Sequence, residues 1–243
     1  QGIRRTVADM KRRLIRSVET DGERQMALLS TEVLYRWAQK EGVETAAIWV
    51  IGKLKLVSAH IPEEMNAEHA QRKLLKLIAG VVLHAIEEME EGISPQERAR
   101  RLDAAIRLGY SYGLTYPFID DLLDAQVLTP QEKAQFSSMV RQALLTGEVP
   151  GLGDWDGASK PLIQYVHAEL REAFECIKRH QGPETKRQFF EQAYVFFHSQ
   201  ELDRAKALSN ADYTNEALYV PIILKSASSR LIARSVLQAP MDT

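Results

Sequence analysis

Apolar residues recur at intervals of three and four positions through nearly the whole chain, and this periodicity constrains the fold more than any other feature. The first segment carries Ile3, Val7, Met10, Leu14 and Val18. A later segment carries Leu74, Leu77, Ile78, Val81, Val82 and Ala85. Residues at this spacing line one face of an α-helix, whereas a half-buried strand needs apolar residues at every second position. The sequence therefore predicts an all-α fold.

Several helices can be placed from this pattern and from their start signals. Beyond the first segment, helices are expected over residues 25–40, 67–90, 160–180, 184–208 and 212–237. Two others begin at Ser94 and Thr129, where Ser-Pro-Gln-Glu and Thr-Pro-Gln-Glu form capping boxes with proline at the first helical position. The second box also predicts that the preceding helix ends near Ala125 or Gln126.

Two further segments bear on the domain organisation. The apolar run at 46–54 fits either a buried helix or a strand, and we predict a helix because a lone strand would have no partner. The segment 148–157 (EVPGLGDWDG) is rich in glycine and reads as a loop. We expect one all-α domain over 1–243 that this loop divides into unequal halves.

Composition excludes several functional classes. The chain has 243 residues, of which 45% are hydrophobic, and this fraction excludes wholesale disorder. Its formal charge of -2 gives no general attraction to nucleic acid, so no nucleic-acid partner is predicted. No apolar run approaches the ~20 residues of a membrane-spanning helix. The single cysteine, Cys176, cannot form an internal disulfide, which favours a cytoplasmic location.

The first predicted helix is strongly basic outside its apolar stripe. The basic positions are Arg4, Arg5, Lys11, Arg12, Arg13 and Arg16. A basic amphipathic helix can lie on an anionic membrane surface, so residues 1–19 are a candidate for peripheral membrane contact. The alternative is a face that is merely solvated.

Three aspartates, Asp120, Asp121 and Asp124, gather at the end of another predicted helix, in the stretch LGYSYGLTYPFIDDLLD. Asp120 and Asp124 lie one turn apart on the same face, and Asp121 is the next position round. No Lys or Arg lies between residues 109 and 131 to neutralise them locally. A divalent cation such as Mg²⁺, which prefers carboxylate oxygens, would provide that compensation. The alternative is an acidic helix end that faces solvent.

The residues before the aspartates are also unusual. Gly109 and Gly113 are one turn apart and would allow another helix or a flat ligand to approach closely. Pro117 lacks a backbone donor and would press on the carbonyl of Gly113, which predicts a kink.

Two motifs carry a family resemblance. The segment from Gly113 to Asp124 resembles the aspartate-rich motif of class I isoprenoid synthases, the group of polyprenyl diphosphate synthases and class I terpene synthases. Tyr116 stands where that family has Phe, and Pro117 where it has Gln. The stretch PIILKSASSRL at 221–231 is similar to the family's Lys-Thr-Ala/Gly-x-Leu helix, and Lys225 stands at the lysine that contacts the substrate diphosphate. Independently, an ammonium after three apolar residues needs an anionic partner if buried, or else snorkels to the surface.

The resemblance implies an isoprenoid-synthase-like helical bundle that ionises an allylic prenyl diphosphate with Mg²⁺. The implied metal ligands are Asp120 and Asp124, with Asp121 a ligand or a neighbour of the ligands. The implied substrate-binding residues are Lys225, Arg230, Arg234 and Tyr116. Tyr112, Tyr116 and Phe118 are candidates for the apolar wall that shields the carbocation, or ordinary core residues. Members of the family often dimerise, so a homodimer is also expected.

Two departures from the family pattern qualify this expectation. The family carries a second aspartate-rich helix after the lysine helix, and this chain reaches Thr243 without one, so we expect a bundle that is incomplete at its C-terminus. No Arg-Arg pair follows Asp124, which counts against elongation of an allylic chain and favours a terpene-synthase-like or diverged member, although a prenyltransferase stays an alternative. The alternative function is a non-catalytic helical binding or scaffold protein that retains the fold.

Overall fold

The computed structural model describes residues 31–115, 117–180 and 182–209. Three sets of predictions lie outside these residues: those on the basic segment 1–19, on Tyr116, and on the predicted helix 212–237 with Lys225, Arg230 and Arg234. The kink expected at Pro117 also adjoins Tyr116 and stays a prediction.

The described part of the chain contains helices and no strand, which confirms the all-α class. The α-helices are α3 (Thr31–Glu41), α4 (Glu44–His60), α5 (Ala67–Glu87), α6 (Pro95–Thr115), α7 (Pro117–Asp124), α8 (Pro130–Thr146), α9 (Lys160–His180) and α10 (Pro183–Ser209). A short 3₁₀ turn, η2 (Glu63–Met65), precedes α5. Most predicted helix ends agree to within one or two residues, whereas α5 ends three residues before the predicted position. None of the described helices is both long enough and apolar enough to cross a membrane.

The apolar run at 46–54 forms part of α4, so the prediction of helix over strand is confirmed. Ala46, Ala47, Val50, Leu54 and Val57 are its buried residues, at intervals of one, three and four. The helix packs against α3, α5 and α6. Its apolar sequence extends to its exposed side, where Ile48 is 59% and Leu56 is 43% exposed.

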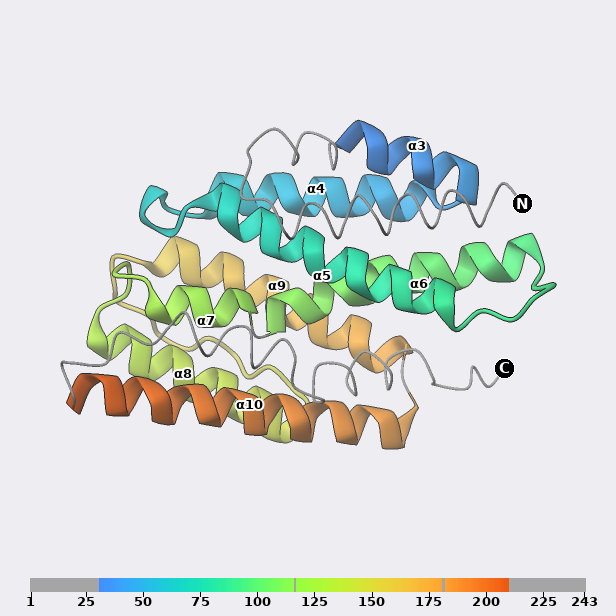
Figure 1. The fold of residues 1–243 in the computed structure, drawn as a ribbon. Coiled ribbons are helices and arrows are strands. Elements are labelled where there is room, and N and C mark those ends of the chain that lie inside the picture. The colour runs from blue at the N-terminus through green and yellow to red at the C-terminus, as the bar shows by residue number, and fades with distance from the viewer. Residues whose placement is uncertain (1–30, 116, 181, 210–243) are drawn as a thin grey trace.

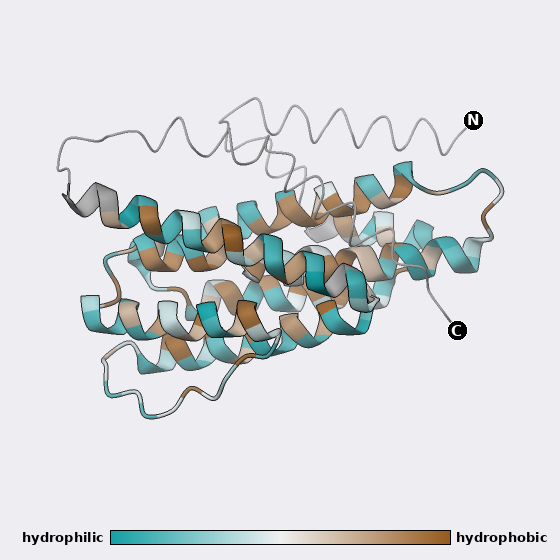
Figure 2. Ribbon diagram, turned by 90° about the horizontal axis from the view of Figure 1, so that it is seen from below, coloured by the Kyte–Doolittle hydropathy of each residue, from teal (hydrophilic) through white to brown (hydrophobic). Residues whose placement is uncertain are grey.

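Helix α6 lies at the centre of the bundle. All eight residues from Leu108 to Thr115 are buried, so this part of the helix has no solvent-facing side. It packs against α5 on one side and α9 on the other, and it also meets α3, α4 and α7 (Figure 1). Most other helices are amphipathic, and hydrophilic and hydrophobic residues alternate along their ribbons (Figure 2). The aspartate-bearing helix α7 lies end to end with α6 (Figure 1).

Gly109 and Gly113 bring α5 against α6. A Cβ atom on Gly109 would lie 2.8 Å from the Cα atom of Ile78, and one on Gly113 would lie 2.7 Å from Cδ2 of Leu74. The sequence left open whether these glycines admit a helix or a flat ligand. In the structure their close neighbour is a helix, α5.

The glycine-rich loop between α8 and α9 is held in place by Glu132, at the start of α8. The capping box predicted at Thr129 is confirmed, because the side chains and backbone amides of Thr129 and Glu132 bond reciprocally. The same carboxylate accepts hydrogen bonds from the indole of buried Trp155 and from the backbone amide of Ser159, both at 3.3 Å. At the other end of the loop, His167 Nε2 lies 2.7 Å from the carbonyl oxygen of Pro150.

Candidate functional site

The aspartate motif occupies a short amphipathic helix. Four residues of α7 are buried: Phe118, Ile119, Leu122 and Leu123. Their spacing of one, three and four places them on the face that meets the bundle. The other side chains of α7 that the structure describes are the three aspartates, which are between 26% and 46% exposed. The helix therefore separates an acidic, partly hydrated face from an apolar interior.

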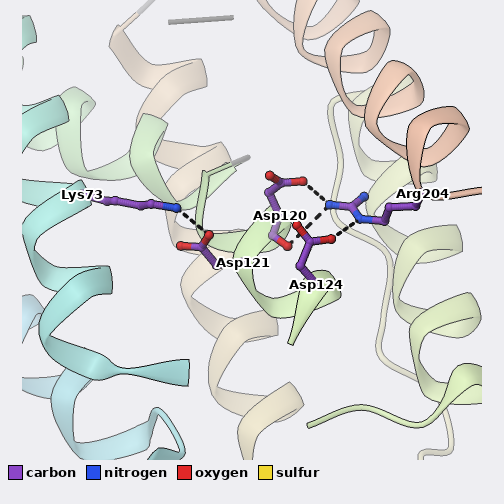
Figure 3. A network of polar contacts seen from close by, with 5 residues as sticks. All are labelled: Lys73, Asp120, Asp121, Asp124 and Arg204. Carbon is purple, nitrogen blue, oxygen red and sulfur yellow. Dashed lines mark hydrogen bonds and ion pairs between the residues drawn. The ribbon is translucent and has the colours of Figure 1, made fainter. Parts of the chain in front are cut away.

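Asp120 and Asp124 both bind the guanidinium of Arg204, which comes from α10. Arg204 Nε donates to Asp124 Oδ1 at 2.6 Å, and Nη2 donates to Asp120 Oδ1. The third guanidinium nitrogen, Nη1, is buried and has no hydrogen-bond partner within the described structure. Asp120 and Asp124 share a face, as their spacing predicted, and their carboxylates converge on one cation (Figure 3).

Asp121 points to the other side of α7. Its Oδ1 atom lies 2.6 Å from Nζ of Lys73, which comes from α5 (Figure 3). Three helices that are distant in sequence, α5, α7 and α10, therefore bring together five charged side chains. We call this group of Lys73, Asp120, Asp121, Asp124 and Arg204 the DDLLD cluster.

Asp120 is the electrostatically unfavourable member of the DDLLD cluster. Burial raises the pKa of Asp120 from 3.8 to about 6, and the carboxylates of Asp124 and Asp121 add to the increase. Arg204 and Lys73 oppose this shift without cancelling it. The two cations therefore do not fully offset the cost of ionising Asp120 beside two other carboxylates.

The carboxylates of the DDLLD cluster are the protein groups that could hold Mg²⁺ here. Within the described ranges, no group of three or more His, Cys, Asp or Glu side chains is placed to hold a metal ion. Mg²⁺ commonly takes only one or two carboxylates, and its other ligands are waters and substrate phosphates. The converging oxygens of Asp120 and Asp124 fit that requirement, whereas Asp121 faces away from them toward Lys73.

Sequence reasoning missed the two cations of the cluster. Lys73 is 48 residues from Asp121, and Arg204 is 84 residues from Asp120. The glycine pair on α6 gave a partial signal, because it allowed the close approach of a helix or a flat ligand, and the helix that approaches, α5, carries Lys73 beside Leu74. No feature of the sequence pointed to Arg204. Tyr112 and Phe118, the described candidates for an apolar wall, are both buried in the core.

A second charged network lies inside the bundle, away from the aspartates. Lys53 of α4 binds Glu169 of α9 at 3.0 Å, and the side chains are only 12% and 10% exposed. Tyr110 of α6 donates to the same carboxylate at 2.8 Å, and its burial raises the pKa of the phenol well above the usual value. The network links three helices, and each of its charges has a partner, which is the condition for burying charge at tolerable cost.

Comparisons of the chain with protein-family models, with curated proteins and with solved structures found no match.

Proposed function

We propose that this protein is a Mg²⁺-dependent enzyme of the class I isoprenoid type that binds an allylic prenyl diphosphate at the DDLLD cluster and ionises it. The observation that supports this most directly is the convergence of Asp120 and Asp124 on one cationic position at a partly exposed helix face. Their sequence context, GLTYPFIDDLLD, resembles the family's aspartate-rich motif.

The electrostatics of the cluster support a divalent cation. The pKa of Asp120 stays at about 6 although Arg204 is bonded to it, so additional positive charge would stabilise the carboxylate. In this proposal Asp120 and Asp124 hold Mg²⁺, and Asp121 stays paired with Lys73. Bound Mg²⁺ supplies Lewis-acid stabilisation of the departing diphosphate.

Other residues of the protein are proposed to attract and contact the substrate. Arg204 and Lys73 keep positive charge beside the carboxylates, where an anionic substrate would otherwise be repelled. On the strength of the resemblance, Lys225, Arg230, Arg234 and Tyr116 are proposed to contact the substrate as well. The buried face of α7 packs into the apolar core.

The binding step is tested by calorimetric titration of a Mg²⁺–prenyl diphosphate mixture into the wild-type chain and into Asp120→Ala/Asp124→Ala. We expect the double variant to bind more than about 100-fold more weakly, because even residues that only support metal ligands change metal affinity by 10–100-fold. The matched control is Asp154→Ala/Asp156→Ala, which removes two exposed carboxylates from the loop before α9. Equal affinity for the two double variants would refute the assignment.

One observation favours the alternative, a non-catalytic helical binding or scaffold protein. Each of the three motif carboxylates already has a protein cation as partner. These ion pairs could serve only to hold α5, α7 and α10 together. A scaffold of this kind would lose thermal stability when Asp120 and Asp124 are replaced, and it would release no pyrophosphate from any prenyl diphosphate.

A further inference from the structure

We propose that the exposed face of α4 is a homodimer interface, on which α4 of one chain packs antiparallel against α4 of a second copy. This inference does not depend on the proposed function, because the face lies on a different helix from the members of the DDLLD cluster. Its basis is an exposed stripe of residues that is symmetric about one glycine. Such a stripe is self-complementary under a two-fold rotation, which is what a closed homodimer requires.

The stripe consists of five exposed residues of α4, which lies together with α3 at one side of the bundle (Figure 1). They are Thr45, Ile48, Gly52, Leu56 and Ala59, and we call them the α4 stripe. Their intervals of three, four, four and three place them on one face of the helix. Ile48 and Leu56 are 59% and 43% exposed, although α3, α5 and α6 all pack against α4. These three described helices therefore leave the stripe uncovered.

The α4 stripe has the same character in both directions from Gly52. A large aliphatic residue lies four positions away on each side, namely Ile48 and Leu56. A small residue lies seven positions away on each side, namely Thr45 and Ala59. When two such helices cross antiparallel at Gly52, Ile48 of one copy lies level with Leu56 of the other, and Thr45 lies level with Ala59. Each residue of the stripe thus meets one of similar size.

Gly52 provides the point of closest approach between the two helices. A Cβ atom added there would meet no atom of the described structure within 4 Å, so packing inside the chain does not require a glycine at this position. Glycine is also the least favourable helix residue apart from proline. A second helix that crosses at Gly52 gives the glycine a role, because helix axes approach most closely where the side chains at the contact are smallest.

The charges of α4 favour the antiparallel direction. Glu44 lies in the first turn of the helix, whereas Lys55 lies in its second half and is exposed. An antiparallel pair brings Glu44 of each copy toward Lys55 of the other, and it also aligns the two helix dipoles favourably. A parallel pair would instead set Lys55 against Lys55 of the second copy. Charge complementarity therefore supports the same arrangement as the symmetry of the stripe.

The size of the interface indicates how strong the dimer is. One helix of 17 residues, about 25 Å long, contributes from each chain. A contact of this size is at the low end of specific protein interfaces, where association is weak and reversible. We therefore expect a dissociation constant in the micromolar range.

Sedimentation equilibrium of the 243-residue chain over a range of concentrations measures the association. We expect the mass of wild type to rise from 27.5 kDa toward twice that value. Gly52→Glu should raise the dissociation constant at least about 100-fold, because the residue on the two-fold axis meets its own copy and like charges at an interface repel strongly. The matched control is Gly80→Glu, an equally open position in α5 that has Lys76 and His84 four residues away on either side. It should dimerise as wild type does.

Two further experiments test the symmetry itself. Gly52→Glu and Gly52→Lys should each be monomeric alone and should form a dimer when mixed, because only a residue on the two-fold axis faces itself. In a Cys176→Ser background, Gly52→Cys should cross-link to a second chain when oxidised glutathione is added, whereas Gly80→Cys should not. The cross-link carries the test if thermal unfolding shows that Gly52→Glu does not fold.

A wild-type chain that stays monomeric would overturn the inference. So would a dimer that Gly52→Glu leaves intact, because the chain would then associate through another face. A monomer that binds phosphatidylserine vesicles and loses this binding in Gly52→Glu would assign the stripe to a membrane surface instead. A monomer in which Gly52→Cys resists a thiol reagent until Val7→Glu is added would assign it to residues 1–19. None of these outcomes involves the DDLLD cluster, so the proposed function and this inference can fail separately.

Discussion

Asp120 shows how a single residue can be unfavourable for the fold and useful for a site. Its carboxylate is partly desolvated where Arg204 of α10 reaches α7, and two other carboxylates lie within the same eight-residue helix. The guanidinium of Arg204 offsets only part of this cost. Residues with a strongly raised pKa of this kind occur often at functional sites, because the function uses charge that folding disfavours.

The raised pKa of Asp120 makes the stability of the protein depend on pH. Because the pKa is raised from 3.8 in the unfolded chain to about 6 in the fold, the folded state binds more protons between these values, and stability falls as the pH rises through 6. Asp120→Asn has no carboxyl group to ionise at this position, so it does not lose stability as the pH rises. Its melting temperature should be about 2–4 °C higher than that of wild type at pH 7.5. The two melting temperatures should converge toward pH 4.

Differential scanning calorimetry between pH 4 and pH 8 measures this difference. Asp154→Asn, at an exposed loop position, controls for the removal of one negative charge. An Asp120→Asn variant that melts below wild type at pH 7.5 would mean that the bond to Arg204 outweighs the desolvation of the carboxylate.

At the residue scale, the sequence was informative wherever one helix determines the geometry. The spacing of Asp120 and Asp124 predicted their common face, and that prediction is confirmed. It was uninformative about the cations, because Arg204 reaches Asp120 across 84 residues and only the packing of α10 determines that distance. The burial that raises the pKa of Asp120 is likewise a property of the assembled helices.

At the element scale, the contact between α5 and α6 positions the motif. Both glycines of α6 face α5, and the two helices approach so closely that a Cβ atom at Gly109 would lie 2.8 Å from a backbone atom of Ile78. The backbone of α5 cannot move aside as a flexible side chain would. The same packing carries Lys73 to Asp121.

Gly109→Ala should therefore destabilise the protein by about 1–3 kcal/mol, the usual range for overpacking a core contact. The matched control is Gly80→Ala in α5, where an added Cβ meets nothing within 4 Å. That control should raise stability by up to about 1 kcal/mol, because alanine is the better helix former. Urea denaturation of both variants measures the difference. A Gly109→Ala variant as stable as Gly80→Ala would show that the helices can separate at little cost.

Helix starts illustrate what local sequence determines. The Thr129 capping box is complete in the structure, and its glutamate, Glu132, also binds Trp155 and Ser159 in the following loop. The Ser94 box is only half formed. The amide of Glu97 donates to Ser94 Oγ, but the carboxylate of Glu97 binds Arg100 and Arg101 instead. Both motifs mark their helix starts correctly, and competition from nearby arginines explains the difference between them.

At the scale of the whole molecule, periodicity predicted the all-α class, and the described helices confirm it. The sequence did not predict which helix is central. Helix α6 is buried from Leu108 to Thr115, although this stretch includes Ser111, Thr115 and two tyrosines. Ser111 and Thr115 donate to the backbone carbonyls of Arg107 and Tyr112, and Tyr110 donates to the carboxylate of Glu169. The contact to Glu169 depends on the packing of α9 and is not evident from the sequence.

We propose that this bundle ionises an allylic prenyl diphosphate at the DDLLD cluster. The most direct measurement is the release of inorganic pyrophosphate from a series of allylic prenyl diphosphates of increasing chain length, with and without Mg²⁺. We predict Mg²⁺-dependent release by wild type, loss of release in Asp120→Ala/Asp124→Ala, and release at the wild-type rate in Asp154→Ala/Asp156→Ala. Absence of release at every chain length, or release that Asp120→Ala/Asp124→Ala leaves unchanged, would contradict the account.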